Sequence, residues 1–128
     1  MKSIWVIILF FLGFHGSAQT FIKRTYYDEL KQMPKEVISI SKADSTLEGP
    51  FLSYYTSGSL QAEGYYHQDK TDSTWTFYFE NGQKKAVGKY ENGKQNGRWR
   101  YYFERGNKRA EGIMKDDIKH GAWVFYFE

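Results

Sequence analysis

The fold is decided by the stretch STWTFYFENGQKKAVGKYENGKQN, residues 73–96. Residues 97–120 repeat its pattern without a gap, residues 49–72 precede it with the same pattern, and residues 121–128 begin it again. A fixed period of this kind is typical of repeat architectures, because each unit is one supersecondary element that must stack on its neighbours. The sequence therefore predicts three units with a 24-residue period and a partial fourth.

Aromatic residues alternate with polar or smaller residues along each unit. Alternation with period two is typical of a strand that buries one face, because successive side chains point to opposite sides. We therefore expect one face of a sheet to shelter a packed core. Its predicted members are Trp75, Phe77, Phe79, Trp99, Tyr101, Phe103, Trp123 and Phe125.

Each aromatic strand is followed by a turn that contains glycine. In the central unit Asn81-Gly82 is predicted as a two-residue hairpin turn of the primed type, since glycine and asparagine tolerate positive φ. That turn places Trp75 opposite Gly88, so that a small residue faces a large ring. The second turn of the unit, at residues 91–94, is expected to be a longer loop whose register the sequence leaves open.

The opposite face of the predicted sheet carries its own pattern of tyrosines and cations. Equivalent tyrosines lie two strands apart, which gives roughly 9–10 Å between rings. The predicted register sets Lys85 beside Tyr78 and Arg109 beside Tyr102, as cations over rings. The candidate binding face comprises Tyr54, Tyr78, Tyr102, Tyr126, Lys85 and Arg109. The alternative is a solvated face on which tyrosine simply suits a strand.

Residues 1–18 have the pattern of a signal peptide. Lys2 is followed by an apolar run at residues 4–14 and by the small residues 16–18 before Gln19. A membrane anchor is the rival interpretation, but a spanning helix needs roughly 20 apolar residues. The sequence thus predicts export to the periplasm, the cell surface or the medium, with no stable membrane insertion after cleavage.

Residues 19–48 are predicted to form a degenerate first repeat that caps the array. Residues 21–27 and 37–41 are suited to two strands, with a bend at residues 33–35. The alternative is a short helix over residues 28–32 that ends at Pro34. Residues 49–128 are then the repeat domain proper.

The composition offers little catalytic chemistry. The chain contains no cysteine, and its two histidines outside the leader, His67 and His120, occupy different positions of the repeat. Without Lys2 the net charge falls from +3 to about +2 and is dispersed, whereas nucleic-acid binding favours a clustered basic stripe. We therefore expect no catalytic residue, no cofactor, no metal site and no nucleic-acid partner.

The last strand is expected at residues 123–127, where the sequence stops partway through a unit. An apolar edge without a hairpin partner invites pairing with another chain. Three outcomes are open: coverage by residues 21–27, pairing with a second copy, or addition of a strand by a partner protein.

The run YENGKQNGRW at residues 90–99, followed by Tyr101-Tyr102 and Arg105-Gly106, resembles MORN-repeat variants. In particular it is similar to the bacterial family labelled YwqK-type antitoxins. The resemblance covers residues 49–128 and implies an elongated antiparallel sheet of successive hairpins that binds a partner protein. Ser73 departs from the pattern, because the other units carry glycine at that position.

These observations predict a single all-β domain, an antiparallel meander of about seven to nine strands built from tandem hairpin repeats. The expected function is that of a non-enzymatic exported module for protein–protein interaction or scaffolding. Two alternatives are an antitoxin or immunity-like protein that neutralises a toxin, and an envelope protein that binds or hydrolyses carbohydrate.

Overall fold

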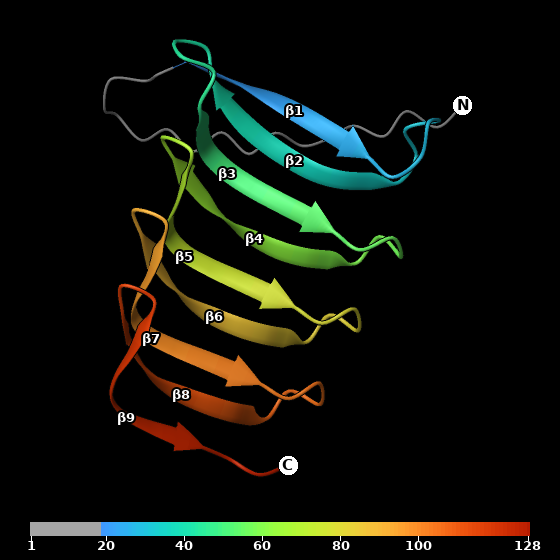
Figure 1. The fold of residues 1–128 in the computed structure, drawn as a ribbon. Helices are drawn as coiled ribbons and strands as arrows, with labels where there is room; N and C mark the ends of the chain where they lie inside the picture. Colours follow the sequence, from blue (N-terminus) through green and yellow to red (C-terminus); the bar gives the residue numbers. More distant parts are fainter. Residues whose placement is uncertain (1–18) are drawn as a thin grey trace.

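The computed structural model describes residues 19–128, which form nine β-strands and no helix (Figure 1). The strands are β1 (Thr20–Tyr26), β2 (Pro34–Ser41), β3 (Leu47–Tyr54), β4 (Leu60–His67), β5 (Lys70–Tyr78), β6 (Lys84–Glu91), β7 (Lys94–Tyr102), β8 (Lys108–Lys115) and β9 (Ile118–Phe125). The predicted signal peptide, residues 1–18, lies outside the described residues.

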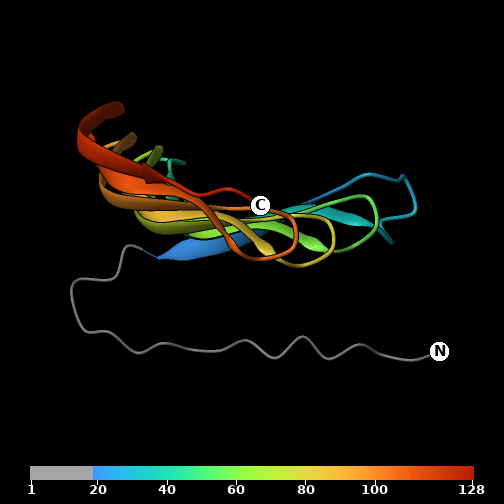
Figure 2. The same cartoon turned by 90° about the horizontal axis from the view of Figure 1, so that it is seen from below.

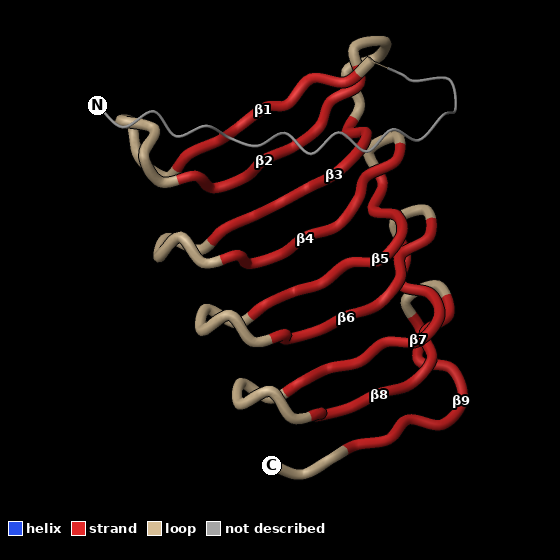
Figure 3. Tube along the Cα trace, turned by 180° about the vertical axis from the view of Figure 1, so that it is seen from behind, coloured by secondary structure: helices blue, strands red, loops and turns tan. Residues whose placement is uncertain are grey.

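The nine strands form one antiparallel sheet in which each strand pairs with its neighbours in sequence (Figure 3). This order confirms the predicted meander of tandem hairpins. Residues 19–128 contain no helix with the length and hydropathy needed to cross a bilayer.

Residues 20–41 form the first hairpin of the sheet, so the strand interpretation of this segment holds and the helix interpretation is wrong. β1 pairs with β2 from Thr20 opposite Ser41 to Tyr26 opposite Pro34. Between the strands the chain makes an irregular loop, in which the Asp28 carboxylate accepts hydrogen bonds from backbone N–H groups rather than starting a helix.

The two kinds of turn are reversed relative to the prediction. The tight two-residue turns are those between units, at residues 68–69, 92–93 and 116–117, where every residue has positive φ. The turn at residues 79–83 has three loop residues instead: the Gly82 N–H donates to the Phe79 carbonyl, and the Phe79 N–H to the Gln83 carbonyl. Only Gly82 has positive φ there.

Asn81 explains why the two-residue turn was wrong. Its side-chain oxygen accepts the Gln83 N–H, and its amide nitrogen donates to the Glu104 carbonyl in the corresponding turn of the next unit. Asn81 is therefore a link between turns. The predicted pairing of Trp75 with Gly88 is still correct, and the register shifts by one residue only between Phe77 and Tyr78.

The sheet is not flat. Figure 2 shows that the strand ends joined by the two-residue turns curl away from the plane of the rest. The odd-numbered strands from β3 onward have a residue with positive φ at the start of this bend, namely Gly49, Ser73, Gly97 and Gly121. Even-numbered strands have a register shift opposite it, between Glu63 and Tyr65 in β4 and at the equivalent places in β6 and β8.

A tryptophan ring lies over a glycine at each of these shifts. A Cβ atom on Gly88 would come within 2.1 Å of the Trp99 ring, and the same holds for Gly64 under Trp75. Although Trp75 pairs with Gly88 across its own hairpin, its ring covers the glycine of the preceding hairpin. Each tryptophan therefore fastens its unit to the unit before it.

The indole N–H groups are satisfied in the same repeating way. Trp99 Nε1 donates to the Lys89 carbonyl at 3.2 Å, and Trp123 Nε1 donates to the Ile113 carbonyl at 3.1 Å. Tyr90 meets the Trp99 ring edge-on, with 5.2 Å between centroids and an interplanar angle of 88°. Rings on either side of the bend thus enclose the indole, so this aromatic face is the inner side of the bent sheet.

Burial is uneven among the eight residues that the sequence assigned to the core. Trp99 is 1% exposed and Trp75 is 4% exposed, although the sheet is a single layer. Five of the eight are half-buried, namely Phe77, Phe79, Tyr101, Phe103 and Trp123. Phe125 is 61% exposed, which corrects its assignment to the core. It lies on β9, where no following described strand supplies a covering ring.

The first prediction concerns the ring over glycine. Gly88→Ala should lower the free energy of unfolding by about 2–3 kcal/mol, because the added methyl group must displace a buried indole. Trp99→Ala should cost about 3–5 kcal/mol. In the double variant the alanine should add almost nothing, since the ring that it strikes is gone. Chemical denaturation of the unmodified protein, the two single variants and the double variant measures the free energies of unfolding. If the two costs were additive, the contact between the Trp99 ring and Gly88 would be contradicted.

The second prediction concerns the left-handed position at the bend. Ser73 has φ 60° where Gly97 has φ 72°, and no atom lies within 4 Å of a Cβ built on Gly97. Ser73→Gly should raise the stability by roughly 0.5–1 kcal/mol, because relief of backbone strain exceeds the added entropy of the unfolded chain. Gly97→Ser should lower the stability by a similar amount. Thermal melts of both variants should shift in opposite directions.

Candidate binding site on the aromatic face

Two adjoining hollows on the inner face of the sheet form a groove that crosses the strands. The first, of about 450 Å³, is lined by Phe51, Ser53, Tyr55, Gln61, Ala62, Trp75, Phe77, Tyr78, Lys85, Ala86, Tyr101 and Arg109. The second, of about 380 Å³, is lined by Tyr101, Arg109, Ala110, Met114, Lys119, Trp123 and Phe125. Both hollows are lined by Tyr101 and Arg109, so they adjoin, and their linings together extend from β3 to β9.

The floor of this groove is a set of repeat positions. Tryptophan and the aromatic residue two positions later recur in the units that begin at residues 73, 97 and 121, and an alanine of a neighbouring strand faces them. In the first unit the same two positions hold Phe51 and Ser53, so the floor is apolar except at its β3 end. The ring contacts continue from one unit to the next. The ring centroids of Trp99 and Tyr101 are 6.0 Å apart, and those of Tyr101 and Trp123 are 6.1 Å apart. The groove is therefore an extension of the core rather than a separate cavity.

The rim of the groove is cationic. Gln61, Lys85 and Arg109 share one repeat position, and all three line the groove. Lys85 Nζ lies 5.7 Å from the Phe79 ring centroid, and Arg109 Cζ lies 5.8 Å from that of Tyr101. These positions correct the sequence-based assignment of Lys85 and Arg109 to the tyrosine face.

The register shift at each first turn is the reason for that correction. It sets Tyr78 opposite Lys84 and Tyr102 opposite Lys108, so Lys85 and Arg109 are the extra residues of their bulges. A bulged residue does not keep the strict alternation of a strand. The side chains of Lys85 and Arg109 consequently lie on the inner face, whereas a two-residue turn would have placed them on the tyrosine face.

Lys119 is a further cation of the groove that sequence reasoning missed. Its Nζ lies 4.6 Å from the Trp123 ring and 5.0 Å from the Phe125 ring. Its repeat position is Gln95 in the preceding unit, so the period gave no signal for it. None of the described residues that line either hollow is Asp or Glu. Within residues 19–128, Lys85, Arg109 and Lys119 have no carboxylate at ion-pair distance.

The tyrosine face is held by its own polar contacts. The Tyr78 hydroxyl donates to the Glu63 carboxylate, and the Tyr126 hydroxyl donates to Glu111 at 2.8 Å. Burial, together with the bond to Glu63, raises the pKa of Tyr78 to about 12. Glu111 also pairs with Arg100 and Lys108. Two of the four tyrosine hydroxyls are thus engaged with carboxylates of the same face.

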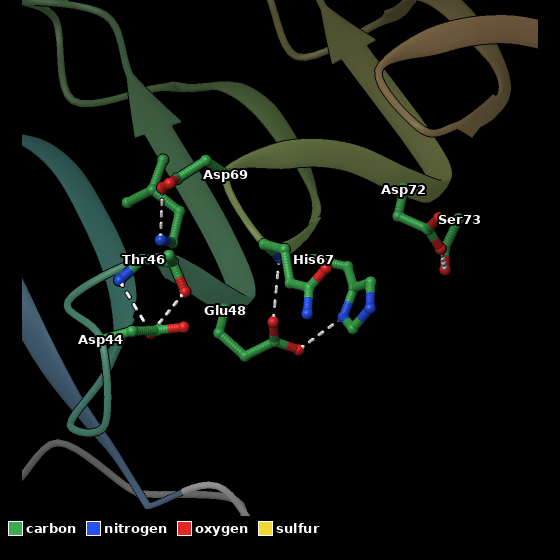
Figure 4. Close-up of polar contacts among 9 residues, drawn as sticks. Asp44, Thr46, Glu48, His67, Asp69, Asp72 and Ser73 are labelled. Atoms are coloured by element: carbon green, nitrogen blue, oxygen red, sulfur yellow. Dashed lines mark hydrogen bonds and ion pairs between the residues drawn. The ribbon is translucent and has the colours of Figure 1, made fainter.

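The polar residues at the turn edge close structural contacts (Figure 4). Asp69 accepts the Leu47 N–H at 2.7 Å, which ties the turn between β4 and β5 to the first residue of β3. Glu48 accepts the Gln68 N–H and lies 3.0 Å from His67 Nδ1. His67 ends β4 whereas His120 lies within β9, so the two histidines are not brought together. Residues 19–128 contain no His, Asp or Glu cluster suited to a metal ion.

Comparison with known families gives one match that follows the hairpins. The model of a family described as "MORN repeat variant" matches residues 47–68, 72–92 and 95–116. Each segment coincides with one hairpin to within two residues at its start, namely β3–β4, β5–β6 and β7–β8. Together they cover just over half of the 128 residues.

Comparison with solved structures finds a chain of the "Glycosylation Associate Protein (Gap123) complex from Streptococcus agalactiae". The TM-score is 0.45 and the sequence identity is 15%. The match covers 82% of this chain but only 18% of that chain's length. Among curated proteins there is no match.

The third prediction concerns the ion pair at the turn edge. The hydrogen bond to Glu48, and then its negative charge, raise the pKa of His67 above the ordinary 6.5. The protonated ring is favoured in the fold, so its contribution to stability is present below pH 6.5 and is lost as the pH rises through the folded pKa. Glu48→Gln should lower the pKa of His67 toward 6.5 in an NMR titration. An unchanged pKa would show that Glu48 is not its cause.

Proposed function

The chain belongs to the MORN repeat variant family, and on that premise we propose that it is a non-enzymatic module that binds a partner protein in the groove of its aromatic face. One observation carries this proposal: an apolar groove lined by repeated aromatic residues has a rim of cations that have no carboxylate partner among residues 19–128. Continuous apolar surface bounded by charge is typical of protein interaction sites.

The individual side chains of the groove are suited to recognition. Aromatic rings contribute large contact areas at low entropic cost, and arginine adds a charge that packs on a ring. Tyr101 and Arg109 lie where the two hollows meet, so this pair is the expected centre of the binding energy. Lys85 and Lys119 extend the charge to either side.

A non-enzymatic role is supported by the structural contacts of the titratable groups at the turn edge and on the tyrosine face. His67, Asp69 and Glu48 close turns at the sheet edge, and Tyr78 bonds to Glu63 on the tyrosine face. Each of these groups is used to hold adjacent strands together. The predicted leader at residues 1–18 supports a further part of the proposal, that binding takes place after export, in the bacterial envelope or outside the cell.

The fourth prediction tests the groove as the binding surface. A photo-crosslinking amino acid at Gln61, which lines the groove, should capture a partner in cells that naturally make the protein, and one at Thr74 should not. The reversal Lys85→Glu/Arg109→Glu should reduce that crosslink by about tenfold, because it sets like charges against the partner. The matched reversal Lys84→Glu/Lys94→Glu, at two exposed lysines that do not line the groove, should leave it unchanged.

Two outcomes would remove the groove from consideration. One is equal capture from Gln61 and Thr74, and the other is capture from Gln61 that both reversals leave intact. Circular dichroism of each variant shows whether the sheet is preserved.

A further inference from the structure

We infer that the partner element in the groove is an acidic amphipathic α-helix that lies across the strands, with two carboxylates seven residues apart. This inference rests on the proposed function and specifies the partner. It follows from three features of the groove: the state of its hydrogen-bonding groups, the spacing of its cations and its length.

The floor offers few hydrogen-bonding groups to a ligand. The Nε1 atoms of Trp75, Trp99 and Trp123 already donate to backbone carbonyls of the sheet. Most of the remaining floor is carbon from aromatic rings, alanine and Met114, and the lining residues Ser53 and Tyr101 carry one hydroxyl each. An extended peptide or a carbohydrate that lay here would leave many polar groups unpaired. A helix satisfies its own backbone and can therefore present an apolar stripe to such a floor.

The spacing of the cations matches the pitch of a helix. Lys85 is in β6 and Arg109 is in β8, at one repeat position and two strand spacings apart, which is roughly 9–10 Å. Helical residues i and i+7 lie on the same face with a rise of about 10.5 Å. Two carboxylates at that spacing can meet both cations, while the apolar residues at i+3 and i+4 lie on the rings between them.

The length of the groove suits a helix of ordinary size. Its lining runs from Phe51 in β3 to Phe125 in β9, which is six strand spacings or roughly 29 Å. That distance corresponds to about 19 helical residues. A bilayer surface fits less well, because the cations surround a hollow on the inner side of a bend and a bilayer is flat on this scale.

Charge excludes two occupants that the chain itself could supply. A second copy facing the first would oppose Lys85, Arg109 and Lys119 to their own equivalents. Residues 1–18 are apolar but carry Lys2 and no Asp or Glu, so they lack the complementary charge. The occupant is therefore a helix of another protein, with apolar residues on one side and acids beside them.

Synthetic helices test this inference by isothermal titration against the full-length protein. The probe is a 21-residue stapled peptide with leucines on one face and glutamates at positions i and i+7. Its matched control has the second glutamate at i+5, which moves that carboxylate to another side of the helix at the same net charge. A third peptide has a central proline in place of the staple. We expect the i+7 peptide to bind about tenfold more tightly than either control.

Charge exchange adds a specific readout. The Lys85→Glu/Arg109→Glu protein should no longer bind the i+7 peptide, and it should bind a peptide that has lysines in place of both glutamates. Equal affinity for the three peptides, no binding of any, or stronger binding to anionic lipid vesicles than to the i+7 peptide would overturn the helix inference. The crosslink from Gln61 reports on the proposed function separately, since it requires a protein in the groove but not a helix.

Discussion

The structure depends on one contact, the indole ring that lies over a glycine of the neighbouring strand. A single-layer sheet has no second layer to cover its apolar face. Here the cover comes from within the face: a ring from one hairpin is laid on the bare backbone of the hairpin before it, and tyrosines close it from the side. Burial of Trp99 to 1% exposure is reached in this way. The glycine is required because any side chain there would occupy the space of the ring.

The same irregularities that seat the rings also create the groove. The register shifts near the bend open the backbone over which each indole lies, and the shifts near the three-residue turns bring Lys85 and Arg109 to the inner face. Stability and recognition are thus properties of one surface. On the outer face, Glu63 and Glu111 already bond to tyrosine hydroxyls, and Glu111 also pairs with two cations of the same face.

Much of this could be predicted from sequence because the period constrains the pairing. The 24-residue repeat and the alternation of aromatics specify hairpins, and the strand partners of Trp75 and Phe77 follow from them. Two local choices were not accessible. Asn81-Gly82 favours a two-residue turn, but Asn81 bonds to the next unit, a contact that exists only once the units are stacked. The face on which Lys85 and Arg109 lie depends on the length of that turn. Predicting two loop residues instead of three therefore placed both cations on the tyrosine face instead of the inner face. The repeat did not identify Lys119 as a groove residue, because the equivalent position one unit earlier is Gln95.

The dependence between units has a direction. The ring that closes a given hairpin always comes from the hairpin that follows it, as Trp75 closes over Gly64 and Trp99 over Gly88. In a chain that is synthesised from its N-terminus, the glycine of each hairpin is therefore made before the ring that covers it. At any stage of synthesis, only the most recently completed hairpin lacks the residue that can cover its glycine. Synthesis in the opposite direction would expose each indole before its glycine had been made.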